Sequence, residues 1–303
     1  MRRGAGQWLG FAEAVGAACL WASSGVFAVN LFRMGVPPES LALLRPVLGG
    51  GILAALVWGF RGQAMRVPRR GLVVLVAGGA VTLGVFQLAY QLSIDAVGVP
   101  TTVALLYLAP AIVAVTSGRL LDEHPTRTHM VLVVVTLVGV WLSVVGAEDV
   151  TATFGSAGLL WGVVAATGYA GYTLLGRYAG PRWGSATTAV YSTVGAVMVL
   201  AVVVPFLTGP LVMPVGWRAW ALLLAFSLTT ITAAQLLFFD ALARIDAGRV
   251  SVATAAEPVV AAILATLLVS QGLRPIGWLG ILLVVIGVAG AGLESNEQEA
   301  TAD

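Results

Sequence analysis

The sequence predicts an all-α integral membrane protein, with ten transmembrane helices arranged as two inverted five-helix repeats. The first observation behind this prediction is composition: 59% of the 303 residues are hydrophobic and only 10% are charged, and the mean hydropathy is +0.96. Soluble domains carry about 25% charged residues, so the polar coat of a water-facing globule is missing here. Composition therefore excludes an ordinary soluble enzyme, a nucleic-acid binder and a disordered chain.

The second observation is a series of apolar runs, each about 20 residues long, which is the length that crosses the hydrocarbon core of a bilayer. These runs cover residues 8–30, 39–60, 71–93, 97–120, 128–146, 156–178, 185–207, 217–243, 248–271 and 275–293. Their hydrophobicity is continuous and does not alternate, which favours helices over the strands of a barrel. The loops left between them are too short for a separate soluble domain.

The arginines predict how the helices are oriented, because cytoplasmic loops of membrane proteins are enriched in positive charge. The sequence contains no lysine, so all 16 basic residues are arginines. Twelve of them lie on the side of the two termini: Arg2, Arg3, Arg61, Arg66, Arg69, Arg70, Arg119, Arg127, Arg177, Arg182, Arg244 and Arg249. Three lie on the opposite side (Arg33, Arg218 and Arg274), and Arg45 lies within a span. We therefore expect a multi-pass protein of the cytoplasmic (inner) membrane with both termini, including the acidic tail 294–303, in the cytoplasm.

The third observation is an internal repeat, which appears when the chain is laid on itself with a shift of 148 residues. The clearest matches are Gln87 with Gln235, Pro110 with Pro258, and Gly139-Val140 with Gly287-Val288. We expect two domains, residues 8–146 and 156–293. Five helices per repeat is an odd number, so the second copy enters the bilayer from the opposite side. Inverted repeats place a shared site near the midplane and permit alternating access, which predicts a carrier.

Several motifs also resemble a known family. They are Leu20–Ser24 in the first span, Arg45 in the second, Leu108-Ala109-Pro110 leading to Asp122-Glu123, Gly139-Val140, Glu257-Pro258-Val259 and Gly287-Val288. In these motifs, residues 8–293 resemble the drug/metabolite transporter superfamily, in the ten-helix branch built from two EamA-type repeats. The resemblance implies a central cavity lined by helices 1, 3, 4, 6, 8 and 9, and small metabolites such as amino acids as substrates, often exported. Gln271 departs from the pattern, because the family usually has a glutamate there.

Glu257 is the sharpest candidate for a functional residue. An ionised carboxylate in the middle of a span costs about 2.5–3.5 kcal/mol to insert, so intramembrane acids usually serve a function. With Ser251 and Thr254 it forms a polar stripe on one helix face. It could bind a substrate amine or carry a proton, or it could join helices by hydrogen bonds.

The other candidate cavity residues are amides and aromatics that lie well inside the spans. They are Gln87, Gln91, Gln235, Trp21, Tyr90, Tyr107, Tyr169, Tyr172, Phe239 and Thr254. Amides donate and accept hydrogen bonds at once, which suits a zwitterionic ligand, although buried amides also join membrane helices. The aromatics could wall a pocket or simply pack.

Three further features leave two alternatives each. Pro110 and Pro258 could act as hinges or as static kinks. Arg45 could hold an anionic substrate, or it could snorkel to the interface or pair with an acid. The small-residue spacings at Gly139 and at Gly287–Gly292 predict close packing of the fifth and tenth helices, as an internal scaffold or as a dimer face.

The leading functional hypothesis is a secondary transporter that moves small organic metabolites, amino acids or related compounds, with export as the expected direction. Its partners would be a small-molecule substrate, the lipid bilayer and, if it is an antiporter, protons; exchange and facilitated diffusion fit equally well. The alternative is a carrier for another ligand class, a nucleoside-like metabolite or a lipophilic cationic drug, in either direction. Cys19 is the single cysteine and His124 and His129 are the two histidines, so we expect no enzyme, no metal site and no cofactor. Monomer and homodimer both stay open.

Overall fold

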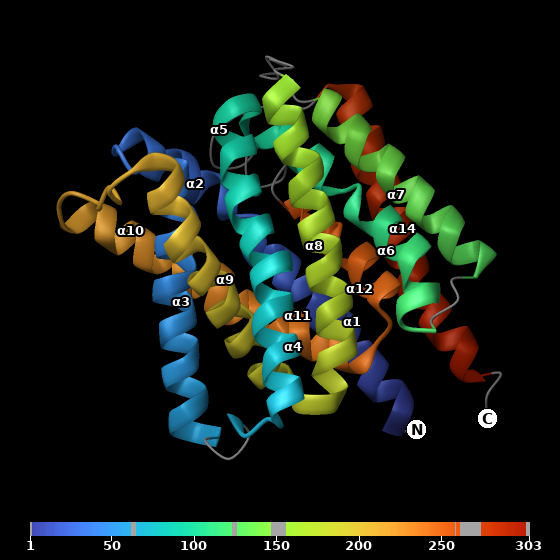
Figure 1. The fold of residues 1–303 in the computed structure, drawn as a ribbon. Helices are drawn as coiled ribbons and strands as arrows, with labels where there is room; N and C mark the ends of the chain where they lie inside the picture. Colours follow the sequence, from blue (N-terminus) through green and yellow to red (C-terminus); the bar gives the residue numbers. More distant parts are fainter. Residues whose placement is uncertain are drawn as a thin grey trace.

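The computed structural model describes residues 2–61, 65–122, 126–146, 156–257, 259–260 and 274–300, and all its regular elements there are helices (Figure 1). Several of the sequence features lie outside these residues, namely Glu123, His124, Pro258, Gln271 and positions 301–303 of the expected tail. In chain order the elements are α1 (Arg2–Trp21), α2 (Ser24–Arg33), α3 (Pro38–Arg61), α4 (Arg69–Gly79), η2 (Ala80–Gly84), α5 (Val85–Leu106), α6 (Ala109–Leu120), α7 (Arg127–Val145), α8 (Ser156–Trp183), α9 (Ser185–Thr208), α10 (Trp217–Ser227), η3 (Leu228–Ala233), α11 (Ala234–Arg244), α12 (Ala247–Thr254) and α14 (Pro275–Ala300).

Seven stretches of the described chain are helical, long and apolar enough to cross a membrane. They are Gly6–Arg33, Pro38–Phe60, Arg69–Gly98, Thr101–Leu120, Ser156–Trp183, Ser185–Thr208 and Trp217–Arg244. The expected fifth and tenth runs correspond to two shorter apolar helices, Arg127–Leu142 and Pro275–Gly290. The expected ninth run, 248–271, lies partly outside the described residues, so the count of ten helices stays a prediction. The prediction of an all-helical integral membrane protein is confirmed.

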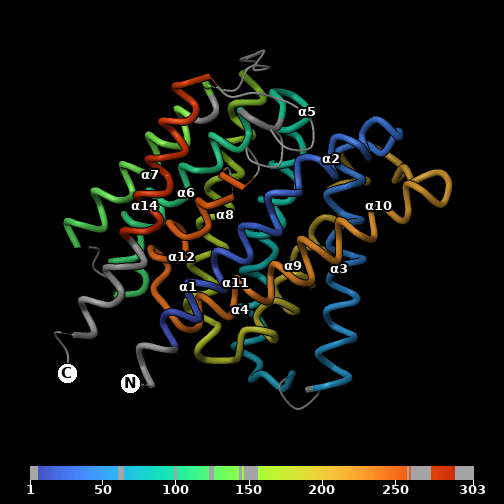
Figure 2. The backbone as a smooth tube through the Cα atoms, turned by 180° about the vertical axis from the view of Figure 1, so that it is seen from behind, coloured from blue at the N-terminus to red at the C-terminus, as the bar shows by residue number. Residues whose placement is uncertain are grey.

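The beginning of α1 and the end of α14 lie at the same end of the helical bundle (Figure 1). Seen from behind, α1 crosses the middle of the molecule beside α11 (Figure 2). Thus the first membrane span of one half packs against a span of the other half, and the middle of the molecule is built from both.

The helices are interrupted at corresponding positions of the two halves. Two π-helical segments, η2 and η3, begin at Ala80 and Leu228, which are 148 residues apart. A second pair of interruptions follows at Tyr107, where α5 ends, and at Ala255, where α12 ends, again 148 residues apart. The spacing is that of the sequence repeat, so the irregularities of the backbone repeat together with the residues.

Two turns between helices have local causes in the sequence. Gly98 has φ 77°, a left-handed conformation that glycine adopts at no steric cost, and there the chain reverses between the third and fourth spans. Pro110 lies in the first turn of α6, where its missing N–H costs no helical hydrogen bond. The helix therefore breaks just before this proline and not around it, and whether the break acts as a hinge stays a prediction.

The glycines of the fifth and tenth predicted helices pack against each other inside the chain. A Cβ atom on Gly139 in α7 would lie 2.7 Å from the carbonyl oxygen of Gly280 in α14, and one on Gly287 would overlap the side chain of Thr136. Such contacts require glycine, because only glycine lets two backbones approach so closely. The small residues thus form an internal scaffold between α7 and α14.

Candidate functional site

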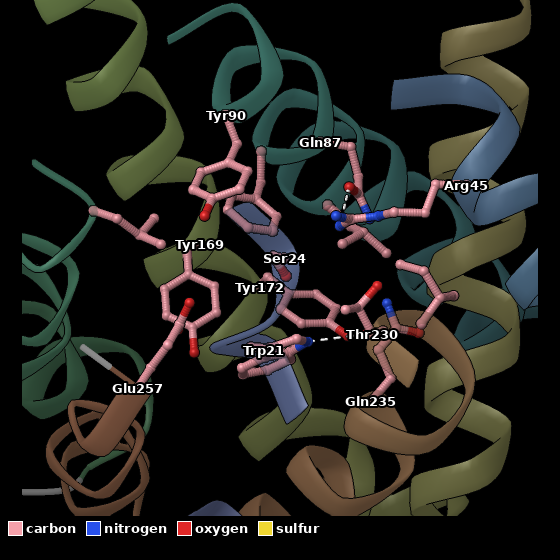
Figure 3. A pocket seen from close by; sticks show the side chains of 14 residues that line it. Trp21, Ser24, Arg45, Gln87, Tyr90, Tyr169, Tyr172, Thr230, Gln235 and Glu257 are labelled. Carbon is pink, nitrogen blue, oxygen red and sulfur yellow. Dashed lines mark hydrogen bonds between the residues drawn. The ribbon is translucent and has the colours of Figure 1, made fainter. Parts of the chain in front are cut away.

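A buried cavity lies where spans of both halves meet (Figure 3). Its lining comes from α1, α2, α3, η2, α5, α8, η3, α11 and the segment just beyond α12. It consists of Trp21, Ser24, Arg45, Leu83, Phe86, Gln87, Tyr90, Leu106, Tyr169, Tyr172, Thr230, Ile231, Gln235 and Glu257. The free volume at its centre is about 30 Å³, enough for about two water molecules. In this conformation the lining side chains therefore leave little free space between the polar groups.

Glu257 forms one side of the cavity, just beyond the end of α12, and is only 8% exposed. The hydroxyl of Tyr107 lies 3.3 Å from its Oε2 atom and 3.4 Å from the carbonyl oxygen of Thr254, so it can donate to either. The Tyr169 hydroxyl in turn lies 3.5 Å from Thr254 Oγ1. Tyr107 and Thr254 therefore stand behind the carboxylate and support it, while Glu257 and Tyr169 face the cavity.

Arg45 forms the opposite side of the cavity (Figure 3) and is 3% exposed. Its Nη2 atom donates a hydrogen bond of 2.6 Å to Oε1 of Gln87, and its guanidinium carbon lies 4.6 Å from the centre of the Phe226 ring. Its Nε and Nη1 atoms have no hydrogen-bond partner among the described residues. This burial is not a snorkelling arrangement, because the guanidinium faces the interior of the protein.

Aromatic rings separate the two charged residues. The Trp21 indole donates its N–H to the carbonyl oxygen of Thr230 at 2.9 Å, and its ring meets Tyr169 edge-on with 5.9 Å between ring centres. The hydroxyl of Tyr172 is buried and has no hydrogen-bond partner in the described part of the chain. Phe239 packs against Tyr172 from behind, with 5.0 Å between ring centres, and does not line the cavity.

The two repeat-related glutamines both line the cavity, and each accepts a hydrogen bond from the same relative position. Gln87 accepts from Arg45, and Gln235 accepts at 3.0 Å from the hydroxyl of Thr193. Arg45 and Thr193 are themselves 148 residues apart, so the two contacts are one interaction repeated with different donors. Gln91 is fully buried but lies outside the lining, and its amide has no partner among the described residues.

The structure thus brings together most of the residues that the sequence singled out. Those that line the cavity are Glu257, Gln87, Gln235, Trp21, Tyr90, Tyr169 and Tyr172. Those that lie behind the lining are Gln91, Tyr107, Thr254 and Phe239. Lining residues that the sequence did not place in the cavity are Ser24, Leu83, Phe86, Leu106, Thr230 and Ile231, and for Arg45 the sequence left the role open. The signal that could have placed Arg45 there is its position, since it is the one arginine more than a helical turn away from both ends of a predicted span.

Polar contacts join several helices at the end of the bundle where α1 begins. Glu13 in α1 pairs with Arg244 in α11 at 2.9 Å, and Arg177 in α8 pairs with Asp246, just before α12, at 2.8 Å. Because the first of these pairs links the two halves, it ties them together at this end.

Comparison with known proteins decides the family. The EamA-like transporter family matches residues 8–145 and, a second time, residues 156–293. The chain belongs to this family. Two relatives of the EamA-like protein are the uncharacterized transporter YwfM of Bacillus subtilis, 26% identical over 90% of each chain, and the uncharacterized inner membrane transporter YicL of Salmonella typhimurium, 24% identical over 93% of this chain and 94% of the relative.

A solved crystal structure also superposes on this EamA-like chain with a TM-score of 0.79, covering 96% of this chain and 98% of the other. At 21% sequence identity this likeness shows the fold alone. The chain is therefore a multi-pass membrane transporter that resembles other transporters over nearly its full length.

Proposed function

We propose that this protein is a secondary transporter that carries amino acids or related small organic metabolites across the cytoplasmic membrane, with export as the expected direction. The observation that carries the proposal is the buried cavity, which both halves build and which holds amides, aromatic rings and one carboxylate. Such a mixture of a few polar groups in a mostly apolar wall is typical of sites for small organic molecules.

The proposed mechanism is alternating access by two inverted five-helix repeats, residues 8–146 and 156–293. It is supported by the 148-residue spacing that relates the π-helical segments, the helix breaks and the glutamine contacts. Two halves of like construction can rock about a shared site, which opens it to each side in turn. Since the cavity holds about 30 Å³ of free space, substrate binding would require the halves to separate on one side.

The orientation follows from the charges. The arginines of the pairs Glu13–Arg244 and Arg177–Asp246 belong to the arginine-rich side, which we place in the cytoplasm together with both termini. The relative in Salmonella typhimurium is named as an inner membrane transporter, which supports the same location here. Contacts that tie the halves together on this side would have to break when the cavity opens to the cytoplasm.

The test is efflux from bacteria preloaded with labelled amino acids, comparing the intact chain with Glu257→Ala. We expect labelled substrate to appear in the medium faster with the intact chain than with the variant. Glu39→Ala is the control, because Glu39 is an acid in the first turn of α3 and lies outside the cavity. Equal efflux by all three proteins would show that Glu257 has no role in transport.

Counterflow into proteoliposomes separates a carrier from a channel. Unlabelled amino acid inside the vesicles should accelerate the uptake of the labelled form only if the site alternates between the two sides. Uptake that does not respond to internal substrate would contradict the carrier. A lipophilic cationic drug fits the cavity less well, because the buried guanidinium of Arg45 would repel it.

A further inference from the structure

The cavity holds a second charge besides Glu257, and the proposed function leaves its role open. We propose that Arg45 binds the anionic group of the substrate and Glu257 its cationic group, so that the site selects a dipolar molecule and fixes its orientation in the cavity. This inference rests on the proposed function and deepens it, since it assigns each end of the substrate to a named residue.

The guanidinium of Arg45 is prepared for a ligand that the protein itself does not supply. Gln87 holds one terminal nitrogen at 2.6 Å, while Nε and the other terminal nitrogen, both buried, have no partner in the described part of the chain. A buried donor of a charged group that has no hydrogen-bond partner costs free energy. A carboxylate binds a guanidinium side by side at Nε and Nη2 or at Nη1 and Nη2, so it would give one of these free donors a partner together with the remaining N–H of Nη2.

Glu257 is the complementary group. Its carboxylate lies in the same cavity, where the Tyr107 hydroxyl is within 3.3 Å of one oxygen. The described residues hold no ion pair between Arg45 and Glu257, and the two point into the cavity from opposite sides (Figure 3). Two buried charges that do not reach each other are stabilised when a bound molecule carries the opposite charge toward each.

The wall between the charges defines the rest of the substrate. Trp21, Tyr169 and Tyr172 present aromatic surface there, and Leu106 and Ile231 add aliphatic surface. An ammonium group approaching Glu257 would also meet the faces of these rings, which attract cations. The wall therefore fits a zwitterion with an apolar or aromatic side chain.

The two halves differ at the position of Arg45, which determines how a bound substrate is oriented. Thr193 occupies in the second half the place that Arg45 occupies in the first, and it makes the equivalent contact to Gln235. Threonine carries no charge, so only the first half can bind the anionic group in this way. A substrate would accordingly keep one orientation within the cavity.

The test measures binding to the purified full-length protein by isothermal titration calorimetry with two probe sets. These are L-phenylalanine and L-leucine, each with its methyl ester, which lacks the anion, and its N-acetyl derivative, which lacks the cation. We expect the intact protein to bind at least one of the free amino acids about tenfold or more tighter than either derivative, because each derivative leaves one buried charge unpaired.

The variants should lose this discrimination selectively. Arg45→Met should bind the amino acid and its methyl ester about equally, while still rejecting the N-acetyl derivative. Glu257→Gln should show the reverse pattern. Arg182→Gln is the control: it removes an exposed arginine that stacks on Tyr178 outside the cavity, and it should keep the full discrimination. Selective loss in one direction cannot come from misfolding, which would weaken all ligands together.

Four results would overturn the inference. Arg45→Met and Glu257→Gln could both keep the preference of the intact protein, or they could both lose affinity for the three ligands of a set in equal proportion. If either variant fails to fold, Arg45→Lys and Glu257→Asp take its place. They should keep the preference for the free amino acid with reduced affinity, and unchanged affinity for all ligands would contradict the inference. Binding of neither amino acid by the intact protein would also overturn it, whereas counterflow of any other labelled metabolite would leave the carrier standing.

Discussion

The contact between Arg45 and Gln87 can be tested by a double-mutant cycle of stability, with the second half of the protein as an internal reference. The cycle compares Gln87→Met, Arg45→Met and the double variant. The bond is short, 2.6 Å, its donor is charged, and both side chains are buried. Hydrogen bonds to charged groups contribute about 1.5–3 kcal/mol, so we expect a coupling energy in that range.

The reference cycle uses Gln235→Met and Thr193→Val. Here the donor is a neutral hydroxyl and the distance is 3.0 Å, so the expected coupling is about 0.5–1.5 kcal/mol, roughly half of the first value. Unfolding can be followed by tryptophan fluorescence in mixed detergent and SDS micelles, since the chain has nine tryptophans. Equal coupling energies in the two cycles, or a first coupling below about 0.5 kcal/mol, would refute the reasoning.

Three further predictions concern packing and the polar contacts. Gly195→Ala should destabilise the protein by about 1–3 kcal/mol, because its Cβ would overlap the backbone of α4. Gly51→Ala is the control and should cause no loss of stability, because its Cβ would meet nothing within 4 Å. Melting temperatures would show both effects. Trp21→Phe removes the indole bond to a backbone carbonyl and should cost about 0.5–1.5 kcal/mol in the same micelle assay, and a neutral result would contradict that bond. Glu13→Gln breaks a partly exposed pair with Arg244 and should cost at most about 1 kcal/mol, with a smaller cost in high salt than in low salt.

The fold class could be predicted from the sequence because a bilayer selects for apolar composition and for apolar runs of a certain length. Both can be read directly from the sequence. The turn at Gly98 was harder to place, since the apolar runs before and after it nearly merge. The site was predicted only in part. Sequence shows that Tyr107 and Gln91 lie deep in spans, but not whether such a side chain faces the cavity or stands behind it.

Arg45 shows a second limit of sequence reasoning. A long arginine side chain near the outer end of a span can reach either the interface or the interior, and the apolar pattern around it is the same in both cases. Only the position of Gln87 on a neighbouring helix decides between them, and that is a contact across 42 residues of sequence.

The two π-helical segments set the rotational phase of the residues that follow them. A turn closed by i→i+5 bonds holds about one residue more than an α-helical turn, and one residue corresponds to about 100° of rotation around the helix axis. Gln87 follows η2 by three residues and Gln235 follows η3 by two. Deleting a single residue from either segment would leave the span apolar and long enough to cross the bilayer. It would nevertheless turn the glutamine that follows in the sequence away from the cavity. Length and hydrophobicity alone thus do not define a working span in this protein; its count of residues is also fixed.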